Sequence, residues 1–284
     1  MSVRYKVAFQ NDIGRIEFTI RNGIAIEKIT SLSQQNAEFE TTKSNRQIGE
    51  KLEAERVSPK TITIRGTLLG ACDAMREQMV HVIAPLSEGK LIFNDTYELD
   101  VRVKTSPDIE RYAANAKFNF SLYAPYPYWR KAENTESTLV GLRGLFSFPW
   151  NISVPNPFAF SEYVEVGYVT VLNTGEAPAY WTVVLQALDE VVKPKIYNME
   201  TGEYVRILKT MEAGEQITIS TEGDELTVTV TAADGTVSDG FPFLDVESIP
   251  FKLAVGENYI KTDAEENTIA LRASISFRPA FVGV

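Results

Sequence analysis

Two-residue alternation of apolar and polar side chains runs through most of the chain and predicts a mainly β protein. Residues 61–68 place isoleucine and leucine on one face of an extended segment, with threonine and arginine on the other. Residues 91–103 alternate on both sides of an Asn-Asp-Thr turn, which predicts a hairpin. Residues 118–122 repeat the alternation with phenylalanine and leucine. The first part of the chain is therefore expected to be built from half-buried strands.

One segment of this part has a helical period. Between residues 70 and 86, an aspartate lies near the start and a proline near the end, as expected at helix boundaries. The apolar residues that recur there every three or four positions are Cys72, Met75, Met79, Ile83 and Leu86. The pattern predicts an N-terminal domain over residues 1–135, a small β-barrel or split barrel that carries one helix.

Residues 34–60 differ from the strands on either side. They are rich in Glu, Lys, Arg and Gln and only weakly periodic. A segment of this length is longer than most simple connections, which favours a functional arm or an extended hairpin. A solvated surface loop is the alternative interpretation, because connecting segments usually run over the surface.

The second half of the chain is expected to be a separate β domain. Glycines and prolines are frequent in residues 136–164, which predicts a linker or crossover. Residues 165–284 contain short alternating segments with turn signals about every 8–12 residues. This spacing indicates a β-sandwich of jelly-roll type.

Charge separates the two halves and limits their partners. Residues 1–135 hold 19 Lys and Arg against 17 Asp and Glu, whereas residues 136–284 hold 9 against 21. An acidic second half argues against a nucleic-acid surface, because binding to phosphates needs clustered cations. The N-terminus lacks the apolar core of a signal peptide. No apolar stretch approaches the ~20 residues that span a bilayer, so we expect no membrane segment.

Candidate chemistry is sparse. The chain has one histidine, His81, and one cysteine, Cys72, which excludes an internal disulfide and a zinc site made of His and Cys alone. Serine and cysteine nucleophiles usually need a nearby base, most often histidine. Acidic turns at residues 222–225 and 263–266 lack the spacing of a calcium loop. We therefore expect no enzyme, no metal and no cofactor, although a glycosidase needs only two carboxylates.

Sugar binding is an open alternative for the second half. A β-sandwich can bind sugar by stacking aromatic rings on the sugar face, and Tyr180 and Trp181 are the candidates. Adjacent residues of a strand point to opposite faces, so at least one of the two is expected in the core.

The order of these motifs resembles the distal tail protein (Dit) family of siphophages and related prophages. The N-terminal part carries T-I-T-I-R-G-T-L at 61–68, L-I-F-N-D-T-Y-E-L-D-V-R-V at 91–103 and F-N-F-S-L-Y-A-P-Y-P-Y-W at 118–129. The C-terminal part carries V-L-N-T-G-E-A-P-A-Y-W at 171–181. Each motif alone is strand and turn chemistry, whereas their order and spacing together are more specific to the family.

The resemblance implies a structural component of the tail tip or baseplate hub. In this family a homo-hexameric ring of N-terminal domains forms a belt around a central channel through which DNA passes, and galectin-like C-terminal sandwiches project outward. The ring joins the tail tube protein to the tail-associated hub protein and can carry receptor-binding proteins. The implied location is the virion tail tip, after assembly in the bacterial cytoplasm. A carbohydrate-binding module and, more weakly, a cell-wall glycan hydrolase are the alternatives.

Within this family interpretation, residues 34–60 could reach a neighbouring subunit or the tail tube. The side chains that we expect to make such contacts are Asn45, Arg46, Glu50, Lys51, Glu53 and Arg56.

Overall fold

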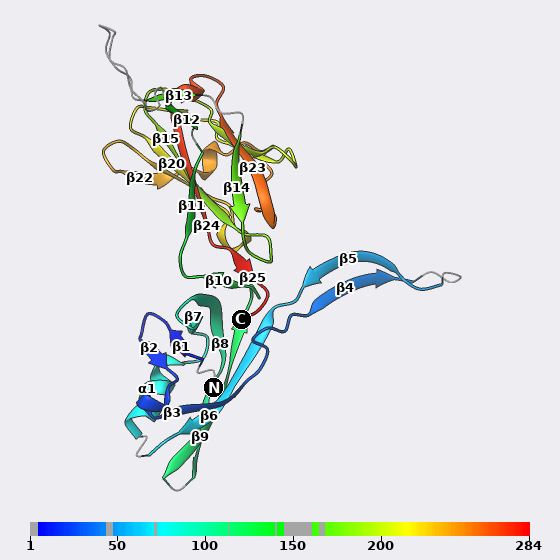
Figure 1. Cartoon of the computed structure of the whole chain (residues 1–284), viewed down its shortest axis with the longest axis vertical. Helices are drawn as coiled ribbons and strands as arrows, with labels where there is room; N and C mark the ends of the chain where they lie inside the picture. Colours follow the sequence, from blue (N-terminus) through cyan, green and yellow to red (C-terminus); the bar gives the residue numbers. More distant parts are fainter. Residues whose placement is uncertain are drawn as a thin grey trace, which may run out of the picture. The chain divides into compact units, whose positions relative to one another are not determined.

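Strands dominate the structure, which confirms the mainly β class (Figure 1). The computed structural model describes residues 5–43, 48–70, 73–112, 114–139, 141–144, 161–164 and 168–284. Within these ranges there is one α-helix, and no helix is both long and apolar enough to cross a bilayer. The chain divides into two compact units, the first formed by residues 1–133 with 280–284 and the second by residues 134–279.

A nine-stranded antiparallel sheet forms the first unit. Its main path runs in the order β2-β1-β7-β8-β9-β6-β3, and β10 pairs with both β8 and β25. The strands are β1 (Val7–Gln10), β2 (Arg15–Glu17), β3 (Ile24–Ile29), β6 (Lys60–Leu68), β7 (Glu88–Phe93), β8 (Tyr97–Tyr112), β9 (Asn115–Ala124), β10 (Trp129–Lys131) and β25 (Ala280–Phe281). The path ends at β2 and β3, so backbone hydrogen bonds between the described strands do not close the expected barrel.

The burial of side chains along β6 follows the apolar and polar alternation that predicted this strand. Ile62, Ile64 and Leu68 are fully buried, while Arg65 is exposed. These side chains join one hydrophobic core with the phenylalanines of the neighbouring strands. The ring centroids of Phe118 and Phe120 lie 6.1 Å apart in a stacked arrangement.

The helix α1 (Asp73–Val82) is shorter than the predicted 70–86. Met79 and Ile83 are fully buried, as the helical period required, whereas Cys72 lies outside the described residues. The expectation that Leu86 continues the apolar face is wrong, because its side chain is 84% exposed and its φ is 66°. Pro85 explains the difference, since proline has no N–H to continue the helix.

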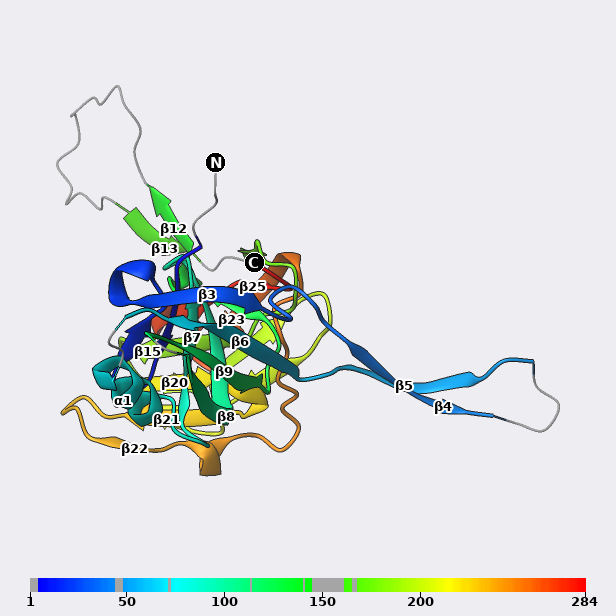
Figure 2. The same cartoon turned by 90° about the horizontal axis from the view of Figure 1, so that it is seen from below.

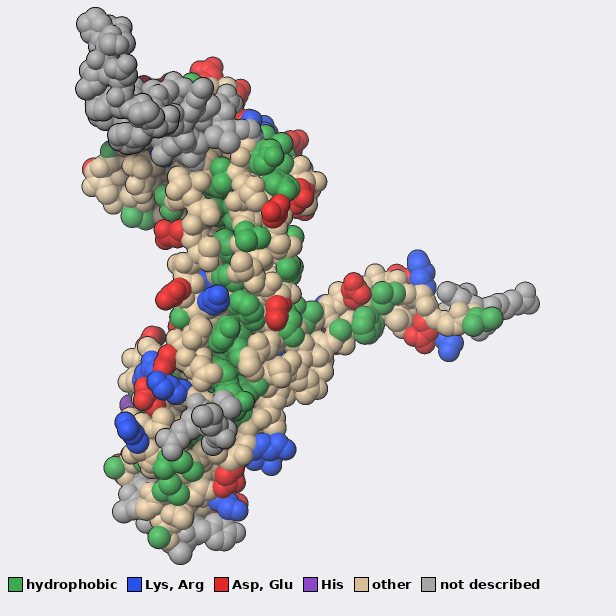
Figure 3. Space-filling model, in the orientation of Figure 1, with side chains coloured by type: hydrophobic (Ala, Val, Ile, Leu, Met, Phe, Trp, Pro, Cys, Tyr) green, Lys and Arg blue, Asp and Glu red, His purple; other side chains and the backbone are tan. Residues whose placement is uncertain are grey.

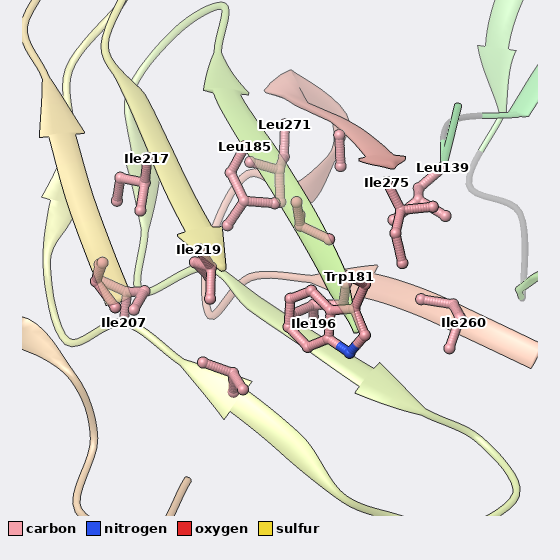
Figure 4. Close-up of a cluster of buried hydrophobic side chains, with 14 of the residues drawn as sticks. Leu139, Trp181, Leu185, Ile196, Ile207, Ile217, Ile219, Ile260, Leu271 and Ile275 are labelled. Carbon is pink, nitrogen blue, oxygen red and sulfur yellow. The ribbon is translucent and has the colours of Figure 1, made fainter. Parts of the chain in front are cut away.

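Two larger antiparallel sheets form most of the second unit, with strand orders β11-β24-β15-β20-β21-β22 and β14-β23-β17-β18. The short strands β16 (Val191–Val192) and β19 (Thr210–Met211) pair separately. The first sheet contains β11 (Thr135–Thr138), β15 (Trp181–Ala187), β20 (Gln216–Ser220), β21 (Thr227–Thr231), β22 (Val237–Asp239) and β24 (Leu271–Phe277). The second contains β14 (Val169–Asn173), β17 (Lys195–Asn198), β18 (Tyr204–Arg206) and β23 (Gly256–Asp263). One core takes side chains from both sheets, including Leu185, Ile219, Ile196 and Ile260, so the unit is a β-sandwich (Figure 4).

The boundaries of the two units lie at other residues than those expected for the two domains. β11 begins at Thr135, continues into the expected linker 136–164 and pairs with β24, and β12 (Gly141–Gly144) pairs with β13 (Ser161–Val164). Residues 145–160 of that segment lie outside the described residues. The last residues of the expected second domain, 280–284, belong to the first unit, where β25 pairs with β10.

Candidate functional site

Residues 34–60 contain a hairpin, which we call the arm hairpin. It consists of β4 (Ala37–Thr42) and β5 (Lys51–Val57), which pair with each other and with no other described strand (Figures 1 and 2). Every residue of both strands is exposed. A single two-stranded hairpin is at best marginally stable in water. The arm hairpin therefore has the character of an element that is completed by a partner.

A β-bulge sorts the side chains of the arm hairpin onto two faces. Glu40 pairs with Ala54, but the next pair joins Thr41 to Leu52, so Glu53 is the additional residue. A bulge residue shifts the alternation of its strand by one position. Leu52 therefore shares a face with Val57, although the two are five residues apart. The apolar face of the arm hairpin carries Ala37, Phe39, Leu52 and Val57, together with Thr41 and Glu55.

The apolar face exposes large side chains to solvent. Phe39 is 61% exposed, Leu52 50% and Val57 43%. Figure 3 shows hydrophobic side chains gathered along the arm beside charged ones. Single exposed apolar residues are ordinary on protein surfaces, but a row of them on one face of a projecting element is typical of a contact surface.

The opposite, charged face is held together by its own side chains. Arg56 Nη2 lies 2.6 Å from Glu38 Oε2, and the hydrogen bond from Arg56 holds the pKa of Glu38 below its ordinary value. Thr42 Oγ1 donates to Glu53 Oε1 at 2.7 Å, and Lys51 Nζ lies 3.7 Å from the same oxygen. The charges of this face are thus largely matched within the hairpin.

The structure places the predicted contact residues unevenly. Lys51, Glu53 and Arg56 lie on the charged face, and Glu50 accepts a hydrogen bond from Thr41 Oγ1 at 2.6 Å. Asn45 and Arg46 lie outside the described residues. The apolar face is not evident from the sequence, because a two-residue period places Leu52 and Val57 on opposite sides.

Buried polar contacts hold the root of the arm hairpin to the first unit. Lys60 is 4% exposed, and its Nζ donates to the carbonyl oxygens of Leu32 at 3.2 Å and Val282 at 3.4 Å. Burial lowers the pKa of Lys60 to about 8. Trp129 Nε1 donates to the same Leu32 oxygen at 2.9 Å. Hydrogen bonds thus hold the chain to the first unit both before the arm hairpin, at Leu32, and after it, at Lys60.

The two sugar-stacking candidates are buried. Trp181 is completely buried, donates from Nε1 to the carbonyl of Phe251 at 2.7 Å, and lies 5.0 Å from the Phe251 ring centroid. Tyr180 is 5% exposed, and Lys252 Nζ lies 4.6 Å from its ring centroid. A sugar needs an exposed ring face, so this arrangement does not support a platform at Tyr180 and Trp181.

Acids, histidine and cysteine do not converge in the part of the chain that the structure describes. No group of three or more His, Cys, Asp or Glu side chains there is arranged to hold a metal ion. His81 is exposed on α1. The arm hairpin is therefore the strongest candidate site, and its geometry suits contact with another protein.

Comparison with known families decides between the interpretations. Residues 11–124 match the family described as "Phage tail protein RIFT-related domain", and residues 174–281 match "Siphovirus-type tail component, C-terminal domain". The chain belongs to the siphophage distal tail protein family. This confirms the resemblance inferred from the motifs and makes this distal tail protein a structural component of the phage tail. No curated protein sequence matches the chain.

Solved structures share the fold of this distal tail protein at low sequence identity. The Dit protein of phage SPP1 has a TM-score of 0.70 at 11% identity, covering 98% of this chain and 99% of that chain. Chains of the activated phage p2 baseplate, determined with strontium and with calcium, each have a TM-score of 0.54 at 11% identity. They cover 97% of this chain and 98% of theirs. The likeness extends over both units.

Proposed function

We propose that this distal tail protein closes into a homo-hexameric ring at the tail tip, and that the arm hairpin makes the contact between neighbouring copies. The ring would join the tail tube protein to the tail-associated hub protein, carry receptor-binding proteins at its periphery, and leave a channel for DNA. Family membership supports the ring, since the SPP1 relative is described as a paradigm of hub adsorption apparatus and the p2 relatives are baseplate chains. The role is structural rather than enzymatic.

The proposal depends most on the exposure of the apolar face of the arm hairpin. Phe39, Leu52 and Val57 are exposed on an element that has no strand neighbour, and burial stabilises apolar surface by about 25 cal/mol per Å². A neighbouring copy that covers this face would bury these side chains, and the same contact would stabilise the hairpin. The hairpin and the ring contact would then form as one event.

A ring also needs a second, different surface on the same chain. Head-to-tail contacts close into rings when one patch meets a complementary patch elsewhere on the subunit. The first unit exposes aliphatic side chains near α1, where Ile13 is 51% exposed and Val80 45% exposed. Asn11 Nδ2 donates to the carbonyl of Val82 at 2.8 Å, which ties the turn that carries Ile13 to the helix. We propose this α1 surface as the acceptor of the arm hairpin.

Electron microscopy of the full-length protein tests the proposal. We expect six-fold rings for the wild type at high protein concentration or with its tail tube and hub partners. The double variant Phe39→Ser/Leu52→Ser should lose rings while keeping its circular dichroism spectrum. The matched variant Glu40→Ser/Ala54→Ser alters the charged face of the same strands and should retain rings. A wild type that stays monomeric even with both partners, or equal assembly of all three proteins, would overturn the proposal.

A further inference from the structure

Most Lys and Arg side chains of the second unit lie on or beside three strands of its four-stranded sheet. Residues 134–279 contain nine Lys and Arg against 21 Asp and Glu, so the unit is strongly acidic. Five of the nine cations lie on β17, β18 and β23 or on the segments that lead into and out of these strands. They are Lys193, Lys195, Arg206, Lys209 and Lys261. This concentration of cations in an acidic unit marks the four-stranded sheet as chemically distinct.

Cations and tyrosines share the outward face of this sheet. Ile196 and Val205 pair across β17 and β18 and are fully buried, so the residues on either side of them point outward. The outward residues form two cross-strand rows, Lys195 with Arg206 and Asp263, and Tyr197 with Tyr204 and Lys261. Two cations of the first row thus lie next to two aromatic rings of the second.

A pocket opens beside these rows. It has a volume of about 420 Å³, and its charged lining residues are Lys193, Lys195, Arg206, Asp263 and Glu265. Asp245 and Glu247 also lie beside Arg206, so most of the positive charge at the pocket is matched by carboxylates. This volume lies within the ordinary range for small-molecule sites.

Lys195 is the cation of this pocket that has no carboxylate partner among the described residues. Its Nζ lies 4.8 Å from the ring centroid of Tyr197 and 5.7 Å from that of Tyr204. By contrast, Arg206 Nε donates to Asp245 Oδ2 at 2.6 Å, and Lys193 Nζ lies 2.6 Å from Glu265 Oε2. Cation–π contacts orient an ammonium group without neutralising its charge. Lys195 is therefore positioned at the pocket wall with its hydrogen-bonding capacity for an anion intact.

We propose that this pocket binds a phosphodiester group attached to a hydroxylated chain. Lys195 supplies the charge-assisted hydrogen bond to the phosphate, and an ammonium group suits this contact as a compact donor. Tyr197 and Tyr204 lie beside the pocket and hold this ammonium group in position through their ring faces. The proposal is independent of ring formation by the arm hairpin.

The carboxylates of the pocket select among phosphates. Asp263 and Glu265 can accept hydrogen bonds from the hydroxyl groups of a polyol. They also repel additional negative charge, and a phosphomonoester carries about −1.5 to −2 near neutral pH, whereas a phosphodiester carries one charge. The pocket should therefore prefer a glycerophosphodiester to glycerol 3-phosphate or inorganic phosphate. Lys195 is a single available cation, which disfavours nucleic acid because its binding needs many phosphate contacts.

Isothermal titration calorimetry with glycerophosphoglycerol tests the proposal on the full-length protein. We expect saturable binding that weakens with added salt, as surface charge interactions do. Lys195→Ala and Tyr197→Ala should each reduce affinity at least about tenfold. Lys252→Ala is the matched control, because Lys252 also lies over a tyrosine ring, that of Tyr180, but does not line this pocket. Its affinity should equal that of the wild type.

Two further ligands distinguish between the possible sources of the phosphodiester. Purified poly(glycerol phosphate) and vesicles containing phosphatidylglycerol present the same group as a polymer or a lipid headgroup, and the pocket should favour the soluble polymer. Absence of saturable binding to glycerophosphoglycerol, equal binding by Lys195→Ala, or equal binding of glycerol would each overturn the proposal. Ring formation by Lys195→Ala should be unchanged, so loss of this site is separable from loss of assembly.

Discussion

Leu52 lies opposite Thr41 in the arm hairpin, one residue out of the register that pairs Glu40 with Ala54. This displacement is caused by Glu53, whose side chain joins the charged face through Thr42. The bulge therefore compensates for the odd spacing between Leu52 and Val57. A single additional residue determines that the arm hairpin has one apolar and one charged face.

Exchanging Leu52 and Glu53 tests this arrangement without changing composition. The variant Leu52→Glu/Glu53→Leu moves the leucine to the charged face, and we expect ring assembly to be lost because the apolar face is interrupted. Deleting Glu53 is the control, since a regular strand still places Leu52 opposite Thr41 and assembly should persist. Mass photometry measures both. Rings formed by the exchange variant would contradict the assigned faces.

Stability of the first unit should increase as the pH rises through 8. The pKa of Lys60 is lowered by burial to about 8 from an ordinary 10.5, so between these values the folded unit binds fewer protons than the unfolded chain. Fewer protons bound in the folded state means that the free energy of unfolding rises with pH in this window. Urea unfolding on either side of pH 8 measures the change. Lys60→Met should lack this rise, and a wild type as flat as the variant would refute the prediction.

Trp181 should contribute stability through its hydrogen bond as well as its volume. Trp181→Phe removes the donor to the Phe251 carbonyl and should cost about 1–3 kcal/mol. Trp181→Ala also leaves a cavity and should cost about 3–5 kcal/mol. Urea unfolding compares both with Val246→Ala, a control at a 99% exposed position. A Trp181→Phe variant as stable as this control would show that the hydrogen bond adds nothing.

Gly66 should not tolerate a side chain. A Cβ at this position would lie 2.3 Å from the carbonyl oxygen of Ala25 and 2.6 Å from Phe118 Cζ. Since backbone occupies the space, Gly66→Ala should destabilise the first unit by about 1–3 kcal/mol through overpacking. Arg65→Ala, on the exposed side of the same strand, is the control for thermal unfolding. Equal melting temperatures of the two variants would contradict the close approach of β3 and β6.

The sequence by itself determined the class of the fold and many of its elements. Alternation predicted β6 with Ile62 and Ile64 in the core, and helical spacing predicted the burial of Met79 on α1 and of Ile83 directly after it. These predictions succeed because the period of side chains along a strand or helix is a local property. The order of strand and turn motifs was also sufficient for the resemblance to the family.

Tertiary structure alone decided the features on which both proposals depend. The shared face of Leu52 and Val57 requires the register of β5 against β4, and the pocket joins Lys195 to Asp263 from strands far apart in the chain. The return of β25 to β10 likewise pairs residues near the end of the sequence with residues near its middle. Strand register and strand partners are set by packing and hydrogen bonds between distant segments, which local periodicity does not encode.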